Sequence, residues 1–353
     1  MRTLLPRSDA GFTLVELLVA ACIAIVLGAV TCWLVVEART MIDMSREKVD
    51  VEGRCRVGVE AIARAMREAG AGVDRGASIG PLRRWLPAVW PGRSDRTAPS
   101  TAITIVRALS TAVPATLSAD APDGTPTLAF ERDSSCTLPC GFHDGMTIVV
   151  FDGRGDFDFF ALVSTDGATA TVRRLNGGTH AAYRRGVPAI PVELRTYYWR
   201  DVGRELRADD GDRGDFPVVN EVVGMAFEYF GDPLPPTAPR PPAGDENCLY
   251  DSSGAPRPAL QSLPTSGGTF APLDAALFAD GPWCGTGTSP FDADLLRIRS
   301  VRLVLRLQAS DAAFRGRDTR WFRNPGTASD PARFVKDVVI QTTISPRNLG
   351  SWR

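Results

Sequence analysis

An apolar run close to the N-terminus constrains this chain more than any other feature. The 25 residues 12–36 contain one carboxylate, Glu16, and no basic residue. As an α-helix with a rise of about 1.5 Å per residue, the run is roughly 37 Å long, which exceeds a hydrocarbon core of about 30 Å. The run therefore predicts a helix that crosses a membrane.

The residues on either side of this run predict its orientation. The polar segment 1–11 carries Arg2 and Arg7, and basic residues are retained on the cytoplasmic side of a membrane. We therefore expect residues 1–11 in the cytoplasm and the residues after Val36 across the membrane. A cleaved secretory signal peptide has an apolar region of only about 7–15 residues. A plain signal anchor is the remaining alternative, and it gives no reason for Glu16.

The sequence around Glu16 supplies such a reason. A carboxylate in a membrane span costs roughly 2.5–3.5 kcal/mol and calls for a partner. Residues 11–17 read GFTLVEL, which resembles the processing site of type IV prepilins and type II secretion pseudopilins. The resemblance implies that a membrane peptidase cuts between Gly11 and Phe12 and methylates the new N-terminal Phe12. It also implies that Glu16 of one subunit pairs with the ammonium group of its neighbour's Phe12 during assembly.

Helical spacing continues beyond the span to about Ala69. Val59, Ala63 and Met66 predict a half-apolar stripe, and the sequence GAG at 70–72 is a typical helix stop. Such a stripe packs against another element of the fold, and we expect that element to be a β-sheet. The predicted organisation is a leader at 1–11, a transmembrane helix at 12–36, an amphipathic continuation at 37–72 and a β-rich globular part at 73–353.

The rest of the chain has the pattern of β-strands. In residues 301–307 arginines alternate with apolar residues, which predicts one solvated and one buried face. The fold class is therefore α+β, with the long N-terminal helix packed on a largely antiparallel sheet. The resemblance implies the type IV pilin form of this layout. The expected strands are 102–106, 127–130, 146–151, 157–163, 169–175, 192–199, 218–230, 298–307 and 334–344.

Between residues 231 and 290 the strand pattern is lost. Six prolines lie between positions 233 and 242, and Gly-, Ser- and Pro-rich sequence follows. This composition predicts a loop-rich insertion and not a separate domain. An exposed insertion is where a common scaffold acquires a particular binding role. A decorative or disordered loop is the alternative.

The seven cysteines divide by position. Cys22 and Cys32 lie in the apolar run, and Cys55 lies on the helix. The others fall in loops predicted to be periplasmic, where disulfides persist. Proximity favours a disulfide between Cys136 and Cys140, which leaves Cys248 to pair with Cys284. The second disulfide would add roughly 3–4 kcal/mol to the free energy of unfolding on the chain-entropy model. A zinc site is the competing interpretation. The disulfide candidates are Cys136, Cys140, Cys248 and Cys284.

Composition narrows the classes of function. The formal net charge is −1, which argues against a nucleic-acid binder, and two histidines are too few for a His-based metal site. No carboxylate pair, nucleophile–base set or phosphate loop stands out from the sequence. We therefore expect a structural protein without catalytic residues, metal or cofactor.

Three further segments resemble PilW-type minor pilins and the related minor pseudopilin J. They are RAMREAGAG at 64–72, the block 197–229, and TTISPRN at 342–348. Together with the length, they favour a PilW-type minor pilin, a class that primes pilus assembly or sits at the pilus tip. The alternatives are a J-type minor pseudopilin of a type II secretion system and a pilin for DNA uptake, which would need an exposed arginine stripe.

The resemblance also implies partners and a location. The partners are prepilin peptidase, other major and minor pilins, the inner-membrane assembly platform and a large tip adhesin. The location is the bacterial inner membrane before assembly, with the globular part in the periplasm, and the pilus at the cell surface afterwards. The sequence leaves open whether such a pilus serves motility, adhesion or uptake.

Overall fold

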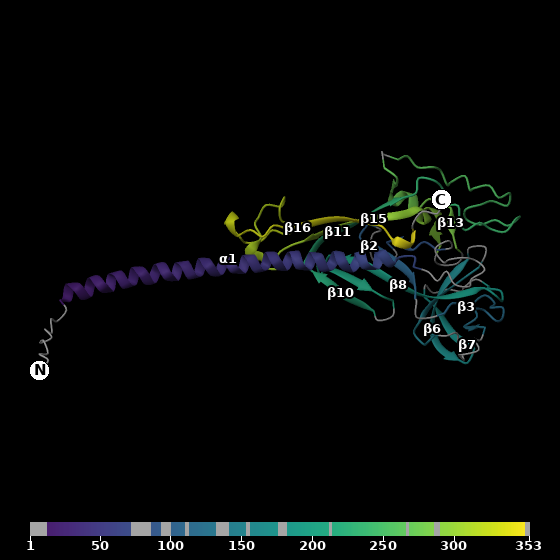
Figure 1. Cartoon of the computed structure of the whole chain (residues 1–353), viewed down its shortest axis with the longest axis horizontal. Coiled ribbons are helices and arrows are strands. Elements are labelled where there is room, and N and C mark those ends of the chain that lie inside the picture. The colour runs from purple at the N-terminus through teal and green to yellow at the C-terminus, as the bar shows by residue number, and fades with distance from the viewer. Residues whose placement is uncertain are drawn as a thin grey trace, which may run out of the picture. The chain divides into compact units, whose positions relative to one another are not determined.

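The fold combines one long helix with antiparallel sheets, which is the α+β class that the sequence predicts (Figure 1). The chain divides into two compact units, Met1–Val51 with Ala309–Asp337, and Glu52–Gln308 with Val338–Arg353. The computed structural model describes residues 13–71, 86–92, 100–109, 113–131, 141–152, 156–175, 182–211, 214–265, 268–285 and 290–349.

Helix α1 spans Leu14–Glu68 and contributes to both units. The helix ends close to the predicted boundary at Ala69. Gly70 adopts a φ of +66°, a conformation that favours glycine and ends the helix. The amide of Gly70 donates to the carbonyl of Val106 at 2.9 Å, outside the helix. In its apolar part an 18-residue window has a mean hydropathy of 2.7, and none of it is buried. Among the described residues, α1 is the one helix with the length and composition to cross a membrane.

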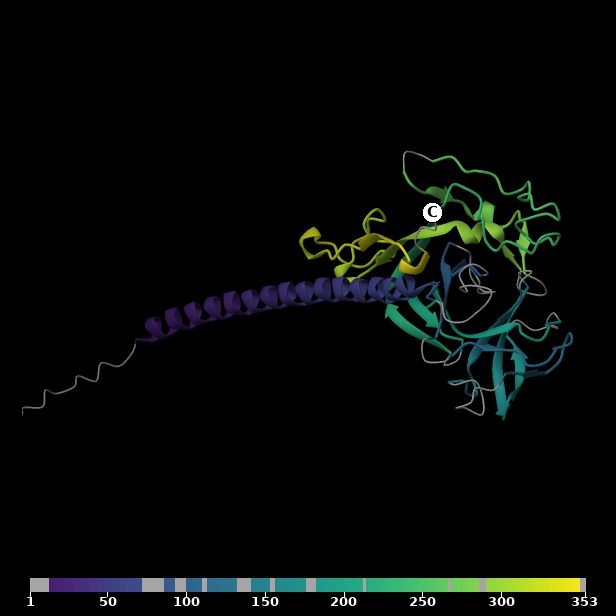
Figure 2. The same cartoon turned by 45° about the vertical axis from the view of Figure 1, so that its right-hand side comes forward.

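The first unit contains the N-terminal part of α1 and the segment Ala309–Asp337, and both views show this segment beside the helix (Figures 1 and 2). A guanidinium nitrogen of Arg333 lies 3.0 Å from a carboxylate oxygen of Glu37. The amide of Ser310 donates to the carboxylate of Glu47. The segment includes two short 3-10 helices, η4 (Ala312–Phe314) and η5 (Pro331–Arg333).

All described strands belong to the second unit, and every pairing between them is antiparallel. The larger sheet has ten strands in the order β1-β2-β8-β5-β6-β7-β4, with β3 and β9 paired to β8, and β10 to β9. The 13-residue β8 organises this sheet, since it pairs with four other strands. The strands are β1 (Val89–Pro91), β2 (Ala102–Ala108), β3 (Ala115–Thr116), β4 (Thr127–Ala129), β5 (Thr147–Phe151), β6 (Phe157–Asp166), β7 (Thr169–Arg174), β8 (Pro188–Arg200), β9 (Glu205–Asp209) and β10 (Asp215–Asn220).

A four-stranded sheet has the order β12-β11-β15-β16, and a two-stranded sheet pairs β13 with β14. Along β15, Val301, Leu303, Leu305 and Leu307 are buried and Arg302 and Arg306 are only partly buried, which confirms the predicted alternation. The remaining elements are β11 (Val222–Gly231), β12 (Ala271–Leu273), η2 (Ala275–Phe278), β13 (Trp283–Cys284), β14 (Phe291–Asp292), η3 (Ala293–Arg297), β15 (Ile298–Leu307), β16 (Val338–Ile344) and η6 (Arg347–Leu349).

Within the second unit, α1 packs closely on the sheets at Gly58. A Cβ atom there would lie 3.1 Å from a methyl carbon of Leu305 and 3.4 Å from one of Leu206. Glycine therefore gives the helix room to approach the strands, which offsets its low helix propensity. Further along the helix, Ala63 and Met66 of the predicted stripe are buried. The stripe packs on sheet, as the sequence predicts.

The predicted strand 218–230 is wrong as a single element. β10 ends at Asn220, β11 begins at Val222, and Glu221 between them has a φ of +58°. That backbone conformation interrupts a strand and is uncommon outside glycine. The carboxylate of Glu221 accepts from Arg204 at 3.0 Å and from Gln308 at 2.7 Å, so tertiary contacts hold the break.

The predicted strand 334–344 is too long at its start. β16 begins at Val338, and residues 334–337, which follow η5, have no regular secondary structure. The side chain of Asp330 accepts from the amide of Ala332 and caps this turn at 2.9 Å. The amide of Val335 then donates to the carbonyl of Phe314 instead of entering a sheet.

The described part of 231–290 is mostly loop, as its composition predicts, but it is packed into the second unit. β12 adds a strand beside β11, and Leu249 and Leu260 are buried. At Gly231, a Cβ would lie 2.3 Å from the carbonyl oxygen of Arg297, so the chain crosses there in a space that only glycine fits. The described residues of this region are therefore an integral part of the second unit.

Candidate functional site

The residues that the processing motif singles out lie at the start of α1. Gly11 and Phe12 lie outside the described residues. Glu16 is described, and its carboxylate accepts hydrogen bonds from the amide and the hydroxyl of Thr13 at 3.0 and 2.9 Å. In return, the amide of Glu16 donates to the Thr13 hydroxyl oxygen at 3.3 Å.

This reciprocal arrangement is a capping box, in which each side chain satisfies an amide that the first helical turn leaves free. We did not predict this role for Glu16, although the sequence signal is present as a threonine three residues before a glutamate. Both donors to the carboxylate are neutral. Among the described residues, no basic side chain forms an ion pair with Glu16, so its charge is available to a cation from elsewhere.

The surface of α1 beyond this cap is strongly apolar. Large side chains of its first half are exposed, among them Leu14 at 79% and Trp33 at 64%. The thiols of Cys22 and Cys32 are free and lie on the same surface. Exposed apolar area on this scale marks a surface that contacts lipid or other proteins. The N-terminal half of α1 is therefore the first candidate functional surface.

A groove of about 670 Å³ between α1 and β16 is the second. Val59 and Ala63 line it from the helix, and Ile340 and Thr342 line it from the strand. β16 is the last strand of its sheet, and no described strand pairs with its outer edge. Its sequence VVIQTTI has neither charge nor proline, the residues that usually protect an exposed edge.

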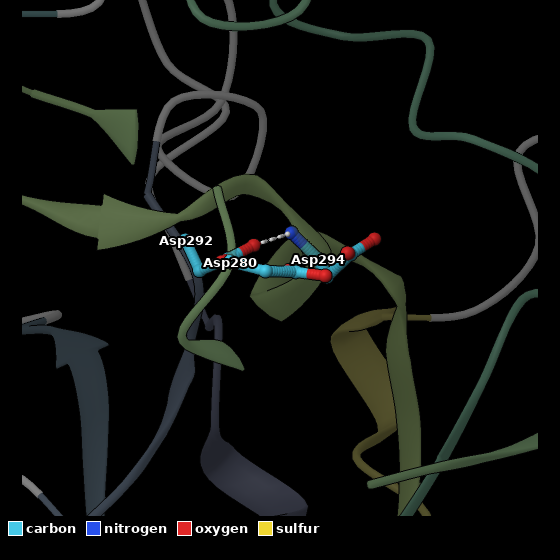
Figure 3. A group of neighbouring side chains, drawn as sticks. All are labelled: Asp280, Asp292 and Asp294. Atoms are coloured by element: carbon cyan, nitrogen blue, oxygen red, sulfur yellow. Dashed lines mark hydrogen bonds between the residues drawn. The ribbon is translucent and has the colours of Figure 1, made fainter. Parts of the chain in front are cut away.

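A group of three carboxylates lies near the end of the 231–290 region (Figure 3). Candidate ligand oxygens of Asp280, Asp292 and Asp294 lie within 4.8 Å of one another. Asp292 accepts from the amides of Gly281 and Asp294 at 2.6 and 2.9 Å, and it thereby caps η3. The Nε of Arg297 lies 2.5 Å from a carboxylate oxygen of Asp294. The cluster thus has a structural use within the chain, and it carries no cation site by itself.

Asp294 makes the stability of this region depend on pH. Burial raises the pKa of its carboxyl to about 6 from an ordinary value of 3.8. The negative charges of Asp292 and Asp280 also act to raise this pKa, and the positive charge of Arg297 acts to lower it. Because the pKa of Asp294 is higher in the folded than in the unfolded protein, the folded protein holds this proton between about pH 4 and pH 6. The contribution of Asp294 to stability is therefore most favourable below about pH 4 and is lost as the pH rises through about 6.

We expect this loss to disappear in Asp294→Asn. Relative to the variant, the wild type should lose roughly 1–3 kcal/mol of unfolding free energy between pH 4 and pH 7. Denaturant unfolding of both proteins at each pH measures the difference. An unchanged or increasing stability of the wild type relative to the variant would contradict the assignment.

Outside the apolar run, the described cysteines comprise one disulfide-bonded pair and one free thiol. Cys248 and Cys284 form a disulfide, with a Cα–Cα distance of 4.9 Å, and this is the pair expected from their proximity. Cys55 is free and fully buried, and burial raises the pKa of its thiol, which makes it a poor nucleophile. Cys136 and Cys140 lie outside the described residues.

Comparison with known proteins adds no relative: no protein-family model matches the chain, and no curated protein matches it. The class that the structure defines is an α+β protein with antiparallel sheets, one disulfide among its described residues, and an N-terminal apolar helix suited to anchoring in a membrane.

Proposed function

We propose that this protein is a PilW-type minor pilin of a type IV pilus, which primes assembly or forms part of the tip complex. The observation that carries the proposal is the sequence GFTLVEL at the start of a helix whose first half is exposed and apolar and whose second half packs on antiparallel strands. The type IV pilin fold is part of the proposal, and the close contact of α1 at Gly58 supports it.

The proposed sequence of events begins in the inner membrane. Peptidase removes residues 1–11 and leaves Phe12 as a methylated cationic N-terminus. Glu16 is then the fifth residue of the mature chain. Its carboxylate has only neutral partners among the described residues, so it can pair with the Phe12 ammonium of the neighbouring subunit. This pair offsets the cost of placing both charges in an apolar filament core and sets the axial register.

The role that follows is structural and interactive, without turnover or cofactor. The apolar half of α1 moves from lipid into contact with the helices of other pilins, while the second unit faces outward. The packed 231–290 region, closed by its disulfide, offers a surface on which a tip adhesin could be held. The length and this insertion favour a pilus over a type II secretion machine.

Intact mass spectrometry of the protein from its native membrane tests the proposal. We expect loss of Met1–Gly11 and one added methyl group on Phe12. As a control, Gly11→Leu should leave the full-length mass, because a bulky side chain would obstruct the peptidase at the bond to be cut. A wild-type chain that is uncleaved, or cut after the apolar run, would contradict prepilin processing.

A further inference from the structure

The segment Ala309–Asp337 lies where the apolar span ends. Residues 12–36 form the apolar run, and Glu37 is the first charged side chain after it. Arg333 contacts Glu37 at 3.0 Å, which places Arg333 at the level of the end of the span. In a bilayer, the headgroup layer extends about 5–7 Å beyond each side of the hydrocarbon core. With α1 inserted, as the proposed function requires, Arg333 therefore lies among the headgroups.

Trp321 lies close to this level. The ring of its neighbour Phe322 packs edge to face on Phe334, the residue after Arg333, with 5.4 Å between centroids. The amide of Asp337 also donates to the carbonyl of Trp321 at 3.3 Å. Phe322 is buried, but the Trp321 side chain is 49% exposed. Tryptophan is the residue most typical of the boundary between lipid and water.

The charge around Trp321 is positive. Residues 315–323 contain four arginines and one aspartate, and the carboxylate of Asp337 accepts from the amide of Arg323 at 2.8 Å. Arg320 pairs with Asp318, but no ion pair within the described part of the chain involves Arg317 or Arg323. The ammonium of Lys336 lies 3.8 Å from the centroid of the Trp321 ring. We call the exposed group Arg317, Arg320, Trp321, Arg323 and Lys336 the basic loop.

We infer that the basic loop binds anionic phospholipid headgroups at the membrane surface from which α1 emerges. Its arginines supply the charge that anionic headgroups complement, and Trp321 supplies an interfacial anchor. The contact holds the first unit against the membrane before assembly. It is broken when the subunit leaves the bilayer for the filament. The inference rests on the membrane anchorage in the proposed function and adds a second, lipid-specific contact to it.

Full-length protein in nanodiscs tests this contact. Lipid brominated near the headgroup quenches tryptophan at the interface, and the signal of Trp321 is the difference between wild type and Trp321→Phe. We expect Trp321 to be quenched in a mixture of phosphatidylcholine and phosphatidylglycerol at low salt. Quenching should weaken in phosphatidylcholine alone and at high salt, because salt screens exposed charges.

Matched variants separate charge from fold. Replacing Arg317, Arg320 and Arg323 together by glutamine should lower the ratio of lipid-bound to lipid-free loop roughly 100-fold, at about fivefold for each arginine. Replacing the same three by lysine keeps the charge and should retain binding. If the lysine variant loses binding as completely as the glutamine variant, headgroup charge is not what the loop recognises.

The other possible outcomes contradict the lipid contact. Quenching that is equal in both lipid compositions, or absent from both, overturns the inference while leaving membrane anchorage intact. Protection of Trp321 by duplex DNA in phosphatidylcholine nanodiscs, without any effect of phosphatidylglycerol, would make the loop a nucleic-acid surface instead. A chain that does not insert into nanodiscs contradicts both the lipid contact and the proposed function.

Discussion

Glu16→Gln should give a subunit that is inserted and processed but excluded from filaments. Glutamine also completes a capping box with Thr13, so the start of α1 should be preserved. What the variant lacks is the negative charge that compensates the Phe12 ammonium in the filament core. An uncompensated charge in apolar surroundings costs on the order of 2.5–3.5 kcal/mol, which predicts incorporation reduced roughly 100-fold. The ratio of the protein in sheared filaments to that in membranes measures it.

Thr13→Ala is the matched control for this experiment. It removes the cap at a cost of about 1 kcal/mol but keeps the Glu16 charge, so incorporation should fall only a few-fold. Filaments that accept Glu16→Gln as well as the wild type would exclude the charge pair. An equal defect in both variants would also contradict the assignment, because Thr13→Ala retains the Glu16 charge and the loss would then not depend on that charge.

Arg174→Leu should destabilise the second unit more than any substitution on its surface. Arg174 on β7 forms a salt bridge with Asp158 on β6, and both side chains are at least 95% buried. The hydroxyl of Tyr183 donates to the other carboxylate oxygen of Asp158 at 2.8 Å. Burial and the Asp158 charge raise the pKa of Tyr183, so this hydroxyl stays a donor. Removing the guanidinium leaves a buried carboxylate, with an expected loss of about 3–5 kcal/mol.

The double variant Asp158→Asn with Arg174→Leu tests the reason for this loss. Asparagine still accepts from Tyr183 but carries no charge, so the double variant should recover most of the stability. Denaturant unfolding of the full chain in detergent gives the three free energies. If the single variant lies within about 0.5 kcal/mol of the wild type, as surface substitutions do, the pair is not important for folding.

Prediction from the sequence succeeded where the signal is repeated over many residues. α1 ends where its spacing predicts, and β15 has the predicted bounds and alternation, because each carries several periods of its own pattern. The short strands β3, β12 and β13 contain too few residues to show a period and were not predicted, whereas the three-residue β4 lies within the predicted strand 127–130. The break at Glu221 was also missed, since no glycine marks it and contacts with Arg204 and Gln308 hold it.

The candidate functional residues also divide into those that a local sequence pattern predicts and those that only the folded structure brings together. The local sequence at 11–17 carries the whole argument for processing, and its capping box could have been read from Thr13 and Glu16. The basic loop could not have been placed beside the span, because Glu37 and Arg333 are 296 residues apart in the chain. No sequence pattern distinguishes its arginines from the others in the chain, and only the contact between Arg333 and Glu37 places them near the end of the span.

By itself, the sequence determined the long apolar helix, the α+β class and the resemblance to prepilins, since each depends on composition and spacing within a short stretch. Only the tertiary structure decided the strand order around β8, the pairing of Asp158 with Arg174, and the position of Ala309–Asp337 beside α1. These features join distant parts of the chain. Their stability comes from desolvation and packing in the folded state, which no local pattern records.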